Sequence, residues 1–95
     1  MPVFVGLLTT ELRIPEAASL KEKRQTLRSL LTRLPSKLKV AVAEVGHQNS
    51  HHQACIATVT VSNDKAQVHS VLMAASEFIQ NQPRVAVQAE TVEII

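Results

Sequence analysis

Hydrophobic and polar residues alternate from position 3 to position 14, and this pattern predicts a long strand. Alternation indicates a strand because successive side chains of a strand point to opposite faces of a sheet. The more apolar side of this segment carries Phe4, Leu8, Leu12 and Ile14. The other side begins apolar and becomes polar from Thr9 onward. Pro15 ends the predicted strand because proline has no N–H to donate to a neighbouring strand.

A helix is predicted to begin after Ser19. The run Ser-Leu-Lys-Glu at positions 19–22 is a capping box, in which the Ser19 hydroxyl accepts from the Glu22 N–H and the Glu22 carboxylate accepts from the Ser19 N–H. Pro35 marks the expected end of this helix. Five leucines fall within one arc of the helical wheel at about 100° per residue, and they are Leu20, Leu27, Leu30, Leu31 and Leu34.

The rest of the chain predicts two strands, a second helix and a last strand. The strands cover residues 38–45 and 54–61 and are joined by a polar loop. The helix is expected to start with Ser62 or Asn63 as its N-cap and to end before Pro83, and the last strand covers residues 84–95. The order βαββαβ predicts a ferredoxin-like α+β domain, with two helices on one face of a four-stranded antiparallel sheet. At 95 residues, 1–95 is expected to be a single domain.

The alternation also predicts which residues face the helices and which lie on the opposite face of the sheet. The helix side is expected to hold Leu38, Val40, Val42, Cys55, Ala57, Val59, Val61, Val85 and Val87. The opposite side is expected to hold Ala41, Ala43, Val45, Ala54, Ile56, Val92 and Ile94, together with Thr58, Thr60, Gln88 and Glu90. Because contiguous apolar surface tends to be covered, we predict a homodimer through this face or through the edge of a terminal strand. A monomer with a sheet of small residues is the alternative.

Composition excludes several classes of function. The chain has two Phe residues and neither Tyr nor Trp, which argues against binding by stacking on aromatic rings. Its single cysteine, Cys55, excludes an internal disulfide and fits a reducing cytosol. The apolar start is interrupted by Thr9, Thr10 and Glu11, so we expect neither a signal peptide nor a membrane span, and a cytoplasmic location.

Positive charge is concentrated in one part of the chain. Residues 13–39 hold eight basic and two acidic side chains, a net +6, whereas the remainder holds two basic and six acidic ones, a net −4. On the helical wheel, Lys21, Arg24 and Arg28 form a stripe beside the leucines, with Lys23 on the other flank. We therefore predict that Lys21, Lys23, Arg24 and Arg28 contact RNA phosphates. The alternative is a solvated helix face, with Lys23 extending along the leucines.

Three runs of residues are similar to a known family. They are Ile-Pro-Glu-Ala-Ala-Ser-Leu-Lys-Glu-Lys-Arg at 14–24, Val-Ala-Glu-Val at 42–45 and Val-Thr-Val-Ser-Asn-Asp at 59–64. They resemble the YlxP-like bacterial proteins, catalogued as domain of unknown function 503. The resemblance implies a ferredoxin-like fold, a cytoplasmic bacterial protein and genes often lying among those for translation and ribosome maturation, without an established activity. Members of the family often carry an acidic residue near Gly46 and a Trp-Gln pair in the hairpin loop, where this chain has His51 and His52.

Candidate metal ligands and catalytic groups are few. His47, His51, His52 and Cys55 lie within nine residues, but their spacing matches no recognised metal motif, so we expect no metal and no cofactor. A metal- or small-ligand-responsive module that uses His47, His51 and His52 remains an alternative. No catalytic residue is expected, because Glu44 has no second carboxylate near it in sequence and Gly6 and Gly46 are isolated rather than part of a phosphate loop.

These patterns predict a non-enzymatic binding protein that acts near translation or ribosome maturation. Its basic first helix is expected to contact RNA phosphates, and its expected partners are a second copy and either ribosomal RNA or a ribosome-associated protein, with no membrane. The alternative is a structural or regulatory homodimer that binds a protein partner, in which the basic stripe serves only solubility.

Overall fold

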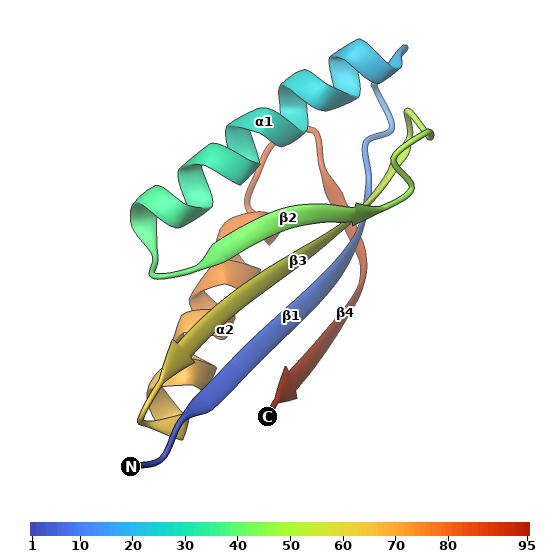
Figure 1. Cartoon of the computed structure of the whole chain (residues 1–95). Coiled ribbons are helices and arrows are strands. Elements are labelled where there is room, and N and C mark those ends of the chain that lie inside the picture. Colours follow the sequence, from blue (N-terminus) through green and yellow to red (C-terminus); the bar gives the residue numbers. More distant parts are fainter.

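A computed structural model describes residues 1–95 and confirms the predicted order of elements. The strands and helices are β1 (Phe4–Arg13), α1 (Leu20–Lys37), β2 (Ala41–Gly46), β3 (Gln53–Ser62), α2 (Lys65–Gln80) and β4 (Ala86–Ile94). The sheet order is β2-β3-β1-β4, and every neighbouring pair is antiparallel. Both helices cover the same face of the sheet (Figure 1), so the ferredoxin-like α+β architecture is confirmed.

The core lies between the two helices and the sheet. Leu8 and Leu12 of β1 are buried there, together with Leu27, Leu30 and Leu34 of α1 and Val68, Leu72, Ala75 and Ile79 of α2. The predicted leucine arc of α1 and the apolar side of β1 therefore both face the core. Burial of these side chains supplies the main driving force for the fold.

The helix ends differ from the predictions in two places. α1 continues through Pro35 to Lys37, because a proline in the last turn removes only one backbone hydrogen bond, and the Leu38 N–H still donates to the Leu34 carbonyl at 3.0 Å. The N-cap of α2 is Asp64, whose carboxylate accepts from the Ala66 N–H at 2.9 Å. At the start of α1, the Ser19 hydroxyl accepts from the Glu22 N–H at 3.2 Å as predicted, but the reciprocal bond of the capping box does not form.

The predicted assignment of the two sheet faces is wrong for β3 and for the second half of β4. The register pairs Leu8 with Thr58 and Thr10 with Ile56, and residues directly opposite each other share a face. The buried, helix-facing residues of β3 are therefore Ala54, Ile56, Thr58 and Thr60. The alternate residues Cys55, Ala57, Val59 and Val61, expected under the helices, lie on the opposite face. Conversely, Glu90, Val92 and Ile94 of β4, expected on the opposite face, lie on the helix side, since they pair with Thr10, Leu8 and Gly6.

We call the face of the sheet away from the helices the open face. Its part over β2, β3 and the start of β1 is aliphatic, whereas Thr9, Glu11, Thr91 and Glu93 make the part toward β4 polar. Its central members are Val5, Leu7, Ala41, Ala43, Val45, Ala57, Val59 and Val61. Val45 and Val61 are 55% and 63% exposed. The open face thus holds more valine than the sequence pattern led us to expect, since the threonines assigned to it are buried instead.

Candidate functional site

The exposed surface of α1 carries five basic side chains and one acidic side chain. The acidic residue is Glu22, and the basic ones are Lys21, Arg24, Arg28, Arg33 and Lys37. None of the five basic groups forms an ion pair. Lys21, Arg24 and Arg28 fall within about 60° of one another around the helix axis at 100° per residue. We call these three residues the basic stripe.

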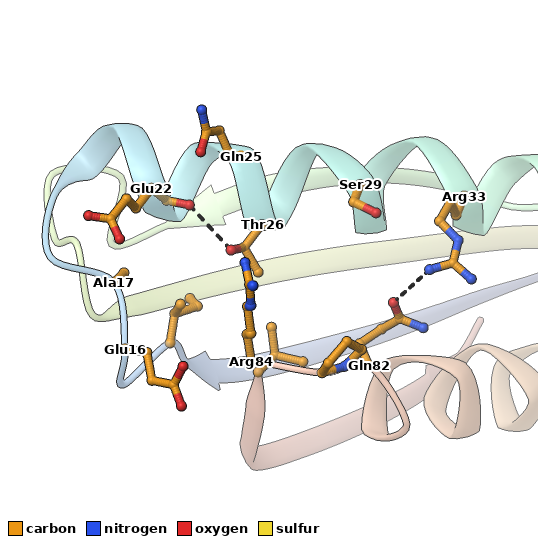
Figure 2. A pocket seen from close by; sticks show the side chains of 12 residues that line it. Glu16, Ala17, Glu22, Gln25, Thr26, Ser29, Arg33, Gln82 and Arg84 are labelled. Atoms are coloured by element: carbon orange, nitrogen blue, oxygen red, sulfur yellow. Dashed lines mark hydrogen bonds between the residues drawn. The ribbon is translucent and has the colours of Figure 1, made fainter.

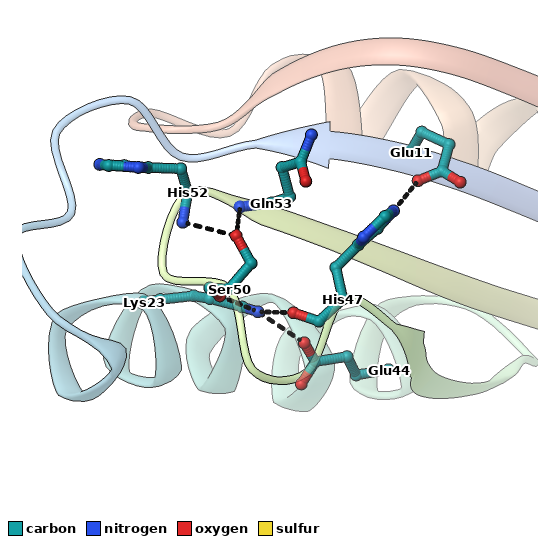
Figure 3. Close-up of polar contacts among 7 residues, drawn as sticks. All are labelled: Glu11, Lys23, Glu44, His47, Ser50, His52 and Gln53. Atoms are coloured by element: carbon teal, nitrogen blue, oxygen red, sulfur yellow. Dashed lines mark hydrogen bonds and ion pairs between the residues drawn. The ribbon is translucent and has the colours of Figure 1, made fainter.

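Lys23 does not belong to this stripe. Its side chain is 1% exposed and its ammonium donates to the carbonyl oxygens of His47 at 2.7 Å and Ser50 at 2.6 Å (Figure 3). Glu44 Oε2 lies 3.0 Å from the same nitrogen. An ammonium has three N–H donors, and three acceptors surround this one. The predicted RNA contact by Lys23 is therefore wrong, and so is the alternative that it runs along the leucines to reach water.

The buried ammonium instead holds the β2–β3 loop, residues 47–52, against the first turns of α1 (Figure 3). Inside the loop, the Ser50 hydroxyl accepts from the backbone N–H groups of His52 and Gln53. His47 has a φ of 59°, which is uncommon for a residue other than glycine. Two features of the sequence are consistent with this arrangement in retrospect. At 100° per residue Lys23 falls inside the leucine arc rather than on its flank, and Glu44 interrupts an apolar strand.

The histidines of this loop do not converge on a metal site. His47 Nε2 lies 3.4 Å from Glu11 Oε2 on β1, whereas the rings of His51 and His52 contact each other with centroids 4.1 Å apart. No group of three or more His, Cys, Asp or Glu side chains in the chain is arranged to hold a metal ion. The structure therefore does not bring His47, His51 and His52 together, and the geometry lends no support to the metal- or small-ligand-responsive alternative.

Cys55 is buried although it lies on the open face rather than under the helices, where the sequence pattern placed it. Its exposed fraction is 8%, and burial together with the adjacent Glu11 carboxylate raises the pKa of its thiol. Because the thiolate is the nucleophilic form of cysteine, this raised pKa disfavours nucleophilic chemistry at Cys55.

One concavity of the molecule corresponds to none of the sequence predictions. It is a groove of about 600 Å³ between α1 and the loop that joins α2 to β4 (Figure 2). Its walls come from both elements and from the segment after β1: Ile14, Glu16, Ala17, Glu22, Gln25, Thr26, Ser29, Arg33, Gln82, Pro83, Arg84 and Val85. These residues are far apart in sequence and share no motif, so only the fold brings them together.

The fold and its surfaces define a small ferredoxin-like α+β domain with a basic helix on one side of the sheet and a partly apolar open face on the other. The family model described as "Protein of unknown function (DUF503)" matches residues 5–92, and the chain belongs to this family. Over 82 residues it is 32% identical to the "Uncharacterized protein YlxP" of Bacillus subtilis (strain 168), covering 86% of this chain and 89% of that protein. The resemblance inferred from the sequence is thereby confirmed.

Two solved structures share the fold. The de novo designed protein Foldit4 has a TM-score of 0.52 and 12% identity, covering 97% of this chain and 93% of its own. A C-terminal segment of the alpha subunit of aIF2 from Pyrococcus abyssi also has a TM-score of 0.52 and 12% identity, covering 100% of this chain and 51% of its own. At this identity the likeness concerns the fold alone. Neither helix has the length and apolar character that crossing a bilayer requires.

Proposed function

We propose that this protein is a non-enzymatic binding protein that contacts RNA phosphates through the basic stripe. The observation that carries the proposal is that Lys21, Arg24 and Arg28 are exposed on one flank of α1 and have no ion-pair partner. Their charges are therefore free to replace the counterions of a polyanion. Lys21 and Arg24 also lie near the N-terminus of α1, where the positive end of the helix dipole favours anions.

The proposed binding uses phosphate and shape contacts rather than base stacking. Both phenylalanines, Phe4 and Phe78, pack against the core, so the open face has no aromatic ring on which a base could stack. Guanidinium groups bind phosphate oxygens in a bidentate manner whatever the base sequence. The gene neighbourhood implied by the family resemblance supports ribosomal RNA in the cytoplasm as the natural target.

Salt dependence tests the proposal. Three phosphate contacts predict a slope of about −2.1 to −2.7 in log affinity against log salt, which is an affinity loss of about 20- to 40-fold between 50 and 200 mM. Fluorescence anisotropy with a labelled ribosomal RNA fragment measures this slope. Combining Lys21→Glu with Arg24→Glu is expected to weaken binding at least tenfold and to flatten the slope.

The matched control combines Lys37→Glu with Lys39→Glu, two exposed lysines at the other end of α1. It makes the same change in net charge away from the stripe. If both double variants weaken binding equally, the RNA responds to net charge alone and the assignment to the basic stripe is overturned.

A second observation favours a homodimer formed through the open face. The centre of this face consists of aliphatic side chains, so its partner must be equally apolar, and a second copy of the chain offers such a surface. Two sheets that pack face to face bury the side chains of both inner faces. A dimer of this kind leaves both copies of α1 on its outer surface. The same dimer fits the alternative function, a structural or regulatory homodimer that binds a protein partner.

Val59→Glu is expected to convert the dimer into a monomer, because it places a charge at the centre of the open face. Light scattering at micromolar concentration is expected to give about twice the chain mass of 10.4 kDa for the unmodified protein and the single-chain mass for the variant. Met73→Glu on α2 is the control, since Met73 is 38% exposed and Val59 is 36% exposed. A monomeric unmodified protein, or equal effects of both substitutions, would contradict the proposed dimer.

A further inference from the structure

The groove between α1 and the α2–β4 loop has charged ends of opposite sign, and the proposed RNA contact does not use it. It lies on the flank of α1 opposite the basic stripe, and its volume of about 600 Å³ is within the usual range for binding sites. We infer that this groove docks an extended peptide segment of a partner protein. The segment carries an acidic side chain at one end and, four or five residues away, a basic side chain at the other.

Arg33 forms a fixed cationic group at one end of the groove. One terminal nitrogen, Nη1, donates to Gln82 Oε1 at 3.0 Å (Figure 2). The Arg33 Cζ atom lies 5.2 Å from the centre of the Phe78 ring. Gln82 is itself held, because its Nε2 donates to the Phe78 carbonyl at 3.2 Å. The guanidinium is therefore oriented before any ligand arrives, while its remaining N–H donors are free for a carboxylate.

Arg84 supplies a second guanidinium, which crosses the groove from the opposite wall toward Thr26 (Figure 2). Its backbone φ is 71°, in the left-handed region that residues with a Cβ rarely adopt. Arg84 makes no ion pair and no side-chain hydrogen bond, although two carboxylates line the same groove. Strained backbone of this kind is concentrated at ligand clamps, and here it holds an arginine without a partner across a groove.

The other end of the groove is acidic. Glu16 and Glu22 line it, and neither carboxylate pairs with an arginine (Figure 2). Between the two ends, Gln25 and Ser29 offer polar groups that suit the backbone of an extended chain. A polyanion lying along the groove would meet the two carboxylates, so this charge pattern disfavours RNA and favours a ligand with both signs of charge.

The distance between the charged ends selects a peptide over a small zwitterion. Glu22 and Arg33 are eleven positions apart on α1, which corresponds to about 16 Å along the helix axis. An extended peptide advances about 3.3 Å per residue, so about five residues span this distance. The two charges of a free amino acid are only a few ångströms apart, so such a ligand contacts only one charged end of the groove at a time.

A series of labelled synthetic peptides tests this inference. Each peptide carries one glutamate and one lysine in a serine and threonine background, separated by zero to seven residues, and anisotropy measures its affinity for the full chain. Affinity is expected to be highest when the glutamate and the lysine lie four or five positions apart. It is expected to fall at least tenfold when either charged residue is replaced by alanine. Equal affinity at all spacings, or no binding by any peptide, would overturn the inference.

Variants of the chain assign the binding to the groove. Arg33→Gln and Arg84→Gln are each expected to weaken the best peptide at least tenfold, whereas Lys65→Gln, an exposed site on α2, leaves its affinity unchanged. RNA binding through the basic stripe is expected to persist in both arginine variants, so failure of one proposal is distinguishable from failure of the other. Displacement of the peptide by ribosomal RNA would assign the groove to RNA and overturn the inference.

Discussion

Replacing Lys23 by methionine is expected to lower the free energy of unfolding by about 3 kcal/mol, which is a melting-temperature decrease of about 12–24 °C for a domain of this size. The Lys23 side chain is 1% exposed, and its ammonium donates to two loop carbonyls and forms an ion pair with the Glu44 carboxylate. Methionine fills a similar volume but donates no hydrogen bond, so the carbonyls lose their partner and Glu44 loses its counter-charge. The expected loss lies at the lower end of the range for broken buried ion pairs because the Glu44 side chain is 19% exposed and retains some hydration.

Lys21→Met is the matched control, since it removes the same charge from the exposed side of the same helix. Lys21→Met is expected to change the free energy of unfolding by no more than about 0.5 kcal/mol. Thermal or denaturant unfolding of the two variants compares them directly. Combining Lys23→Met with Glu44→Gln is expected to lower the free energy of unfolding by less than the sum of the two single losses. The reason is that the double variant leaves no buried charge without a partner. Equal effects of Lys23→Met and Lys21→Met would contradict the structural role of this lysine.

Gly6→Ala is expected to lower the free energy of unfolding by about 2 kcal/mol through overpacking. Gly6 lies on β1 beneath α2, and a Cβ atom there would contact Val68 Cγ1 and would lie 2.8 Å from Leu72 Cδ1. Both neighbours belong to the buried face of α2, so the helix would have to move away from the sheet. The absence of a side chain at Gly6 thus allows the close approach of helix and strand.

Two further variants test this explanation. Gly46→Ala places a Cβ atom 3.1 Å from Cys55 Cβ at the rim of the sheet. It is expected to lower the free energy of unfolding by less than Gly6→Ala does. Val68→Ala in the Gly6→Ala background is expected to recover part of the lost stability, because it removes the clashing methyl group. Denaturant unfolding measures both. If the stability loss of the double variant equals the sum of the losses of Gly6→Ala and Val68→Ala, the substitution at Gly6 does not act through Val68.

The order of elements could be predicted because each follows from a strong local pattern. The leucine arc of α1, the Ser19 cap and the alternation in β1 each required only a short window of sequence. The face of β3 could not be chosen in this way, since both sides of the strand carry small or apolar residues. Only pairing with Leu8 and Leu12 across the sheet decides that Ile56 points inward and Val59 outward.

The site residues show the same limit. Lys21, Arg24 and Arg28 could be placed on one exposed flank because helical periodicity alone determines their neighbours. The acceptors of Lys23 come from a loop more than twenty residues away and are mostly backbone carbonyls, which leave no mark in the sequence. The groove likewise is lined by Arg84, whose positive φ is a conformation that residue type does not predict for arginine.

Photocrosslinking in growing cells tests the central claim, RNA binding by the basic stripe, most directly. Thr32 is exposed and follows Arg28 by one helical turn, so a photoreactive amino acid at this position samples whatever binds beside the stripe. We predict that ribosomal RNA is recovered covalently attached to the chain, and that its yield falls at least tenfold when Lys21→Glu and Arg24→Glu are added. Recovery of protein without RNA, or an RNA yield that these two substitutions leave unchanged, would contradict the claim.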